Sequence, residues 1–152
     1  MSVTAMIAEM NKQERIAWLG AALFVPVALY LGWRLFLDPA GIDGLASTAA
    51  QRAGARVFML FLLGYGWIRW KGAGRFIDER DLRIAARAAV VGYLWLALTL
   101  IAAAHVLGLE SFQDYVRSRS LAWLEAFLMF GLVSSGAAIS CTRAVLYWRD
   151  RR

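Results

Sequence analysis

The chain has 152 residues, of which 61% are apolar and 18% are charged, and its mean hydropathy is +0.54. A soluble domain of this length needs more charged residues to cover its surface, so the composition excludes an ordinary soluble fold and favours an integral membrane protein. The net charge of +6 would also suit a nucleic-acid-binding protein, but the basic residues lie at the ends of apolar runs, which is typical of membrane topology. We therefore expect the basic residues to contact anionic lipid headgroups and not nucleic acid.

The first apolar run covers residues 16–37 and is long enough to cross a hydrocarbon core of about 30 Å as a helix. The segment before it, residues 2–15, is polar with a few apolar positions. It is predicted either to lie on the inner membrane surface as a short amphipathic helix, with Met6, Ile7 and Met10 toward the lipid, or to be disordered.

The second apolar run is free of charge only over residues 57–68, which is too short to span a bilayer. Thr48 and Gln51 have the spacing of a capping box, in which a hydroxyl and an amide satisfy early backbone N–H groups, so a helix is predicted to start near residue 49. A helix over residues 50–70 becomes a second span if its flanking arginines extend their charged ends to opposite interfaces.

A third apolar run covers residues 85–109, and a fourth covers residues 120–142 and precedes a basic tail, residues 143–152. The length and hydropathy of the four runs predict an all-α protein with a single domain, residues 1–152, made of four transmembrane helices in up-and-down order.

The placement of basic residues predicts the orientation of this bundle. If both termini are cytoplasmic, twelve of the 17 Lys and Arg residues fall on the cytoplasmic side and five on the other side. This excess agrees with the positive-inside rule. We therefore expect a multi-pass protein of the inner membrane with cytoplasmic N- and C-termini.

A cluster of charged residues separates the second and third runs, in a predicted cytoplasmic loop over residues 71–84. Asp78 is a suitable N-cap for the third helix, and acidic residues near a helix start interact favourably with its dipole. The cluster is predicted to form a surface for anionic lipid headgroups or a protein partner, made of Asp78, Glu79, Arg80, Asp81, Arg83 and Arg87. A divalent-cation site is the alternative, but adjacent acids point in different directions on a helix, so no metal is expected.

The sequence "IDERDLRIAARAAVVGY", residues 77–93, resembles a motif of small, uncharacterised bacterial membrane proteins that carry "DER" followed by an acid between their second and third apolar runs. The matching positions are Asp78, Glu79, Arg80, Asp81, Ile84 and Tyr93. The resemblance implies a four-helix inner-membrane protein, with some members encoded beside small helix-turn-helix regulators. It implies no role for any individual residue.

Glu125 is the one acidic residue inside a predicted span, about five residues from the outer end of the fourth helix. A carboxylate inside the bilayer usually has a partner, and His105 has a similar predicted depth on the antiparallel third helix. We expect an intramembrane polar pair of Glu125 and His105, with Arg34 or Arg56 as alternative partners. The functional alternative is a small proton- or cation-coupled transporter that uses Glu125.

The remaining candidates for chemistry favour packing. Cys141 has no second cysteine with which to form an intramolecular disulfide, and small residues surround it. Gly131 and Ser135 have the i, i+4 spacing of close helix packing, within one bundle or between copies of the chain. His105 is predicted near the opposite face from these serines, so no nucleophilic pair is expected. The sequence thus predicts a protein without enzymatic activity or cofactor, acting as an interaction or regulatory membrane subunit through its basic loop and tail.

Overall fold

The computed structural model describes residues 10–38, 45–71, 78–108, 113–114, 117 and 121–150, and this part of the chain is all-α. Four long helices make up most of it: α2 (Lys12–Phe36), α3 (Leu45–Trp70), α4 (Glu79–Leu107) and α6 (Leu121–Arg149). The predicted fold class is confirmed at this level.

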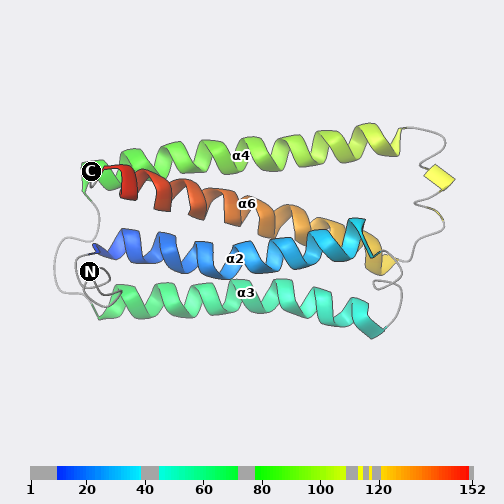
Figure 1. Cartoon of the computed structure of the whole chain (residues 1–152), viewed down its shortest axis with the longest axis horizontal. Helices are drawn as coiled ribbons and strands as arrows, with labels where there is room; N and C mark the ends of the chain where they lie inside the picture. The colour runs from blue at the N-terminus through cyan, green and yellow to red at the C-terminus, as the bar shows by residue number, and fades with distance from the viewer. Residues whose placement is uncertain are drawn as a thin grey trace.

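The four helices lie side by side and alternate in direction (Figure 1). α6 packs against each of the other three helices, α2 also packs against α3, and α4 packs mainly against α6. The starts of α2 and α4 therefore lie at the same end as the ends of α3 and α6, and we call this the N/C end. The opposite end, where α2 and α4 finish and α3 and α6 begin, is called the far end.

α2 begins before the predicted span of residues 16–37 because Asn11 caps it. The Asn11 side chain accepts a hydrogen bond from the backbone N–H of Glu14 at 2.7 Å, which satisfies one of the unpaired donors of the first turn. Met10 precedes this cap and is only 9% exposed, so the prediction that it faces lipid is wrong. Residues 1–9, the rest of that predicted segment, lie outside the described residues.

α3 begins at Leu45 and not near residue 49, so the predicted capping role of Thr48 is wrong because this position lies inside the helix. Leu45 and Ala46 are strong helix formers, and they allow the helix to extend past the hydroxyl-bearing residue. The end of α3 at Trp70 agrees with the prediction.

α6 corrects the predicted tail at residues 143–152. The helix continues to Arg149, and Ala144 and Tyr147 are only 3% and 0% exposed. Burial of these two side chains against the neighbouring helices stabilises the extra turns, since tertiary packing supplies most of the stability of a helix.

The core lies where α2, α3 and α6 meet, and its buried members are Phe24, Leu31, Val57, Val133 and Ala137. The ring of Phe24 lies 5.1 Å, between ring centroids, from each of Phe58 and Phe61 on α3. Such tilted aromatic pairs add favourable electrostatic interactions to the burial of apolar surface.

Two glycines allow α6 to approach its neighbours closely. A Cβ atom at Gly20 of α2 would overlap the side chain of Ser140, and one at Gly92 of α4 would overlap the side chain of Ile139. Small residues at helix interfaces permit such close backbone approach, particularly in membranes.

Large apolar side chains are exposed along the outside of the helices, among them Leu62 and Leu63 on α3 and Leu98 and Ile101 on α4. Three of the helices are long and apolar enough to cross a membrane, over Lys12–Phe36, Glu79–His105 and Trp123–Arg149. α3 is not among these three, since the arginines within it lower its mean hydropathy. These properties are those of a membrane protein with at least part of its surface in contact with lipid.

Candidate functional site

A buried carboxylate joins three helices at the N/C end. Asp81, in the first turn of α4, is only 6% exposed. Its Oδ1 atom accepts a hydrogen bond from the hydroxyl of Tyr147 on α6 at 2.7 Å and a longer one, 3.4 Å, from Nδ2 of Asn11 at the start of α2. Burying a carboxylate is costly unless donors surround it, so these hydrogen bonds fix the three helix ends relative to one another.

Asp81 is also part of the cap of its own helix. The backbone N–H of Asp81 donates to Oδ1 of Asp78 at 2.7 Å, and the backbone N–H of Asp78 donates back to Oδ2 of Asp81 at 3.3 Å. These two reciprocal hydrogen bonds form a capping box, with Asp78 as the N-cap residue and Asp81 at position N3 of the helix. The predicted role of Asp78 as an N-cap is confirmed, and the cap places Asp81 where it can meet Tyr147.

Further polar contacts surround this carboxylate. Nη2 of Arg143 donates to Oε1 of Gln13 at 3.3 Å, which links α6 to α2. Nε of Arg80 lies 3.2 Å from Oδ2 of Asp150, and the Arg80 guanidinium lies 5.8 Å from the centre of the Tyr147 ring. We refer to Asn11, Gln13, Asp81, Arg143 and Tyr147 as the end cluster.

The end cluster is suited to holding helices together. The three donors around Asp81 occupy its oxygens, and the residues described in the structure include no group of three or more His, Cys, Asp or Glu side chains that could hold a metal ion. A carboxylate whose lone pairs are already occupied is a poor general base, so the geometry favours a structural role for it.

The structure divides the predicted lipid or partner surface. Glu79, Arg83 and Arg87 are exposed on α4, and the side chain of Arg80 is 41% exposed. Asp81 does not belong to this surface, and its inclusion was wrong because its side of α4 faces α6 and α2.

No family model, curated protein or solved structure matches this chain. The resemblance of the "DER" motif to small bacterial membrane proteins therefore stays a prediction, and the interpretation of the site rests on its geometry.

The second predicted site, Glu125 with His105, lies at the far end. Both side chains are exposed, and no hydrogen bond or ion pair joins them in the described part of the chain. Glu125 instead borders a hollow between α3 and α6, where Arg52 of α3 forms part of the opposite wall. Both residues lie toward the far end of their helices, as the sequence predicts, but Glu125 faces the hollow beside α3, which does not favour the predicted pair.

This far-end hollow has a volume of about 390 Å³. Its walls are formed by Arg52 and Ala55 of α3 and by Glu125, Leu128, Met129 and Leu132 of α6. One basic and one acidic side chain therefore accompany four apolar side chains. This combination suits a ligand with both charged and apolar parts.

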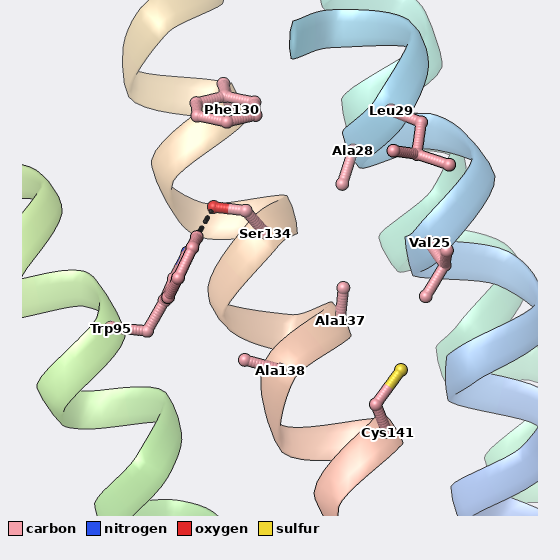
Figure 2. Close-up of a pocket in the computed structure, with 9 residues that line it drawn as sticks. All are labelled: Val25, Ala28, Leu29, Trp95, Phe130, Ser134, Ala137, Ala138 and Cys141. Atoms are coloured by element: carbon pink, nitrogen blue, oxygen red, sulfur yellow. Dashed lines mark hydrogen bonds between the residues drawn. The ribbon is translucent and has the colours of Figure 1, made fainter.

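A second hollow lies over α6 between α2 and α4 and has a volume of about 330 Å³ (Figure 2). Its lining is apolar apart from a hydrogen bond of 3.0 Å from the indole N–H of Trp95 to the hydroxyl of Ser134, which ties α4 to α6. Cys141 lines the same hollow beside Ala137 and Ala138.

Sequence reasoning did not identify Asn11 or Tyr147 as members of a site. A signal for Tyr147 was present, because the buried residues of α6 recur at alternating intervals of four and three: Val133, Ala137, Ser140, Ala144 and Tyr147. This spacing marks one continuous helix face that runs through the predicted tail. Asn11 could have been found as a cap residue three positions before Glu14.

Proposed function

We propose that this chain is a four-span inner-membrane protein without enzymatic activity, and that its N/C end faces the cytoplasm and binds anionic lipid headgroups and a protein partner. The observation that carries the proposal is the exposure of Arg83 and Arg87 on α4 beside Arg80. The nearby acids Asp81 and Asp150 are already engaged by Tyr147 and Arg80.

The exposed surface of α3 supports its crossing of the membrane as the fourth span. α3 has 26 residues, one more than α2, and it packs alongside α2. Met59, Leu62 and Leu63 are exposed on it, and these side chains are stable in lipid but costly in water. Trp67 and Trp70 are exposed near its end, as expected for residues at a membrane interface.

The distribution of basic residues supports a cytoplasmic N/C end. Nine Lys and Arg residues among those described lie toward this end: Lys12, Arg15, Arg69, Lys71, Arg80, Arg83, Arg87, Arg143 and Arg149. Among the same described residues, Arg34, Arg52, Arg56 and Arg117 lie toward the far end. Such an excess is characteristic of the side that stays in the cytoplasm.

Reporter fusions test this orientation. A reporter joined after residue 75 or after residue 150 is expected to be active only in its cytoplasmic form, and one joined after residue 117 only in its external form. An external signal from the first two fusions would contradict the proposed topology.

The docking surface is tested by comparing two double variants. Full-length tagged protein is purified from its native host in mild detergent as wild type, as Arg83→Gln with Arg87→Gln, and as the control Arg52→Gln with Arg56→Gln. All four arginines are exposed, and the two pairs lie at opposite ends. We expect at least one protein to accompany the wild type and the control but to be lost, by about tenfold or more, from the first variant. Identical sets of proteins in all three preparations would contradict the docking surface.

The alternative function is a proton- or cation-coupled transporter that uses Glu125. It is supported by the position of Glu125, whose exposed side chain lies at the edge of a hollow. If the chain is such a transporter, Glu125→Gln abolishes proton-dependent flux in proteoliposomes while helix content and assembly stay unchanged. Flux that survives this substitution would exclude the alternative.

A further inference from the structure

The far-end hollow combines side chains of opposite charge near the start of α3 and α6, which is the depth of lipid headgroups if both helices cross the membrane. Glu125 is the fifth residue of α6 and Arg52 the eighth of α3, so they lie about 6 Å and 10 Å along their helices at a rise of about 1.5 Å per residue. Both side chains are exposed. A ligand in this position would thus meet one cationic and one anionic group near the interface.

The rest of the hollow is apolar and continues toward the middle of the helices. Leu128 and Leu132 follow Glu125 by about one and two turns of α6, and both are exposed. At its base α3 and α6 approach closely, since a Cβ atom on Gly54 would lie 3.3 Å from Sδ of Met129. The charged side chains at the rim match the position of a phospholipid headgroup, and the exposed leucines below them match the position of its acyl chain.

We propose that this hollow binds a phospholipid whose headgroup carries a primary ammonium, as in phosphatidylethanolamine. The guanidinium of Arg52 binds the phosphate, the carboxylate of Glu125 accepts hydrogen bonds from the ammonium, and one acyl chain lies along Leu128 and Leu132. The inference depends on α3 and α6 lying in a membrane but not on the proposed cytoplasmic partner, so it can stand or fail independently of that partner.

The chemistry of the rim favours this headgroup over two common alternatives. An anionic phosphatidylglycerol headgroup offers a phosphate to Arg52 but has no cation for Glu125, and its charge is repelled by the carboxylate. A phosphatidylcholine headgroup carries a quaternary ammonium that cannot donate hydrogen bonds and is usually bound by aromatic rings. The described residues that line the hollow include no aromatic side chain.

Lipid titration of the purified full-length protein tests the proposal. Delipidated full-length protein that carries Arg83→Gln and Arg87→Gln, which remove the proposed anionic-lipid surface at the N/C end, is titrated in detergent separately with palmitoyl-oleoyl phosphatidylethanolamine, phosphatidylcholine and phosphatidylglycerol. Bound lipid is counted by native mass spectrometry. The ethanolamine lipid is expected to bind about tenfold more tightly than the other two, which corresponds to one charge-assisted hydrogen bond of about 1.4 kcal/mol. Equal binding of the three lipids, or a preference for phosphatidylglycerol, would overturn the proposal.

Two variants separate the two charged contacts. Glu125→Gln is expected to lower the affinity for phosphatidylethanolamine about tenfold, to that of phosphatidylcholine, whereas Arg52→Gln weakens all three lipids because they share the phosphate. Arg56→Gln on α3 is the matched control, because Arg56 is exposed and does not line the hollow. Unchanged selectivity in Glu125→Gln, with helix content retained by circular dichroism, would also overturn the proposal.

Discussion

The two ends of the molecule differ in how their polar side chains are bonded: the contacts described below join different helices at the N/C end and stay local to one helix at the far end. At the N/C end, Asp81 of α4 accepts hydrogen bonds from Tyr147 of α6 and from Asn11, which caps α2. At the far end, the ion pair of Arg34 and Asp38, 2.7 Å apart, lies within and just beyond a single helix. Polar groups near lipid are costly, and the N/C end offsets this cost by hydrogen-bonding its buried carboxylate across helices. At the far end, the exposed side chains of Arg52 and Glu125 line a hollow.

This difference matters most for α4, because its main neighbour is α6. Among the described residues, Tyr147 donates to Asp81 at the N/C end, Trp95 donates to Ser134 near the middle, and Arg80 donates to Asp150 just beyond the end of α6. Toward the far end, Ala104 and His105 of α4 are exposed, and Figure 1 shows this part of α4 diverging from α6. We infer that the N/C end carries most of the polar stabilisation of α4.

Asp81→Ala is expected to have the largest effect, since it removes the acceptor shared by the three helices. The substitution leaves the donors on Tyr147 and Asn11 without their partner and also removes half of the capping box. It is expected to lower the free energy of unfolding by about 3 kcal/mol. The measurement is SDS titration in mixed micelles, followed by circular dichroism.

Glu79→Ala is the matched control, because Glu79 lies in the same first turn of α4 but is exposed. It is expected to change the free energy of unfolding by no more than about 0.5 kcal/mol. Equal losses for Asp81→Ala and Glu79→Ala would show that the buried carboxylate does not stabilise the N/C end.

Tyr147→Phe tests the strongest single contact of the end cluster. The ring remains to fill the buried space, but Asp81 loses the donor at 2.7 Å, so a loss of about 1.5 to 2 kcal/mol in the free energy of unfolding is expected. Tyr93→Phe, at an exposed tyrosine of α4, is expected to have almost no effect. Combining Tyr147→Phe with Asp81→Asn should cost less than the sum of the two single changes, and strict additivity would argue against a direct interaction.

The sequence predicted the all-α fold class, three of the four apolar helices that it proposed as spans, and the cap at Asp78, because these depend on local composition and spacing. It did not predict that Asp81 is buried, since hydropathy gives the depth of a residue along a helix but not the neighbour that it faces. Glu125 shows the same limit, because its position near the far end was correct while its direction toward α3 and Arg52 was not foreseen.

Tyr147 was missed for a different reason. The sequence pattern places residues 143–152 in a basic cytoplasmic tail after the fourth span, but Arg143 bonds to Gln13 of α2 and the helix continues beside it. A charged side chain near a helix end can extend its polar group away from the core while its backbone stays in the bundle. Charge alone therefore did not locate the end of α6.

Two glycine substitutions compare the packing of the two ends. Gly20→Ala, in the half of α2 toward the N/C end, forces a Cβ atom against Ser140 and is expected to cost about 1 kcal/mol even after the gain in helix propensity. Gly54→Ala, toward the far end of α3, meets the flexible end of Met129 and is expected to be neutral or to stabilise the protein by about 0.5 kcal/mol. Both values come from the same SDS titration. If Gly54→Ala proved the more destabilising of the two, the far end would be packed as rigidly as the N/C end.

The smallest expected effects come from the ion pairs of Arg80 with Asp150 and of Arg34 with Asp38. Asp150→Asn breaks the contact with Arg80, in which the side chains are 41% and 40% exposed, so solvent screening limits the loss to about 0.3 kcal/mol. Asp38→Asn breaks the contact with Arg34, whose side chain is only 15% exposed, and should cost about 0.5 to 1 kcal/mol. Raising the salt concentration is expected to reduce the loss for Asp150→Asn more than the loss for Asp38→Asn. A large and salt-independent loss for Asp150→Asn would mean that Arg80 stabilises the N/C end as strongly as the buried Asp81 does.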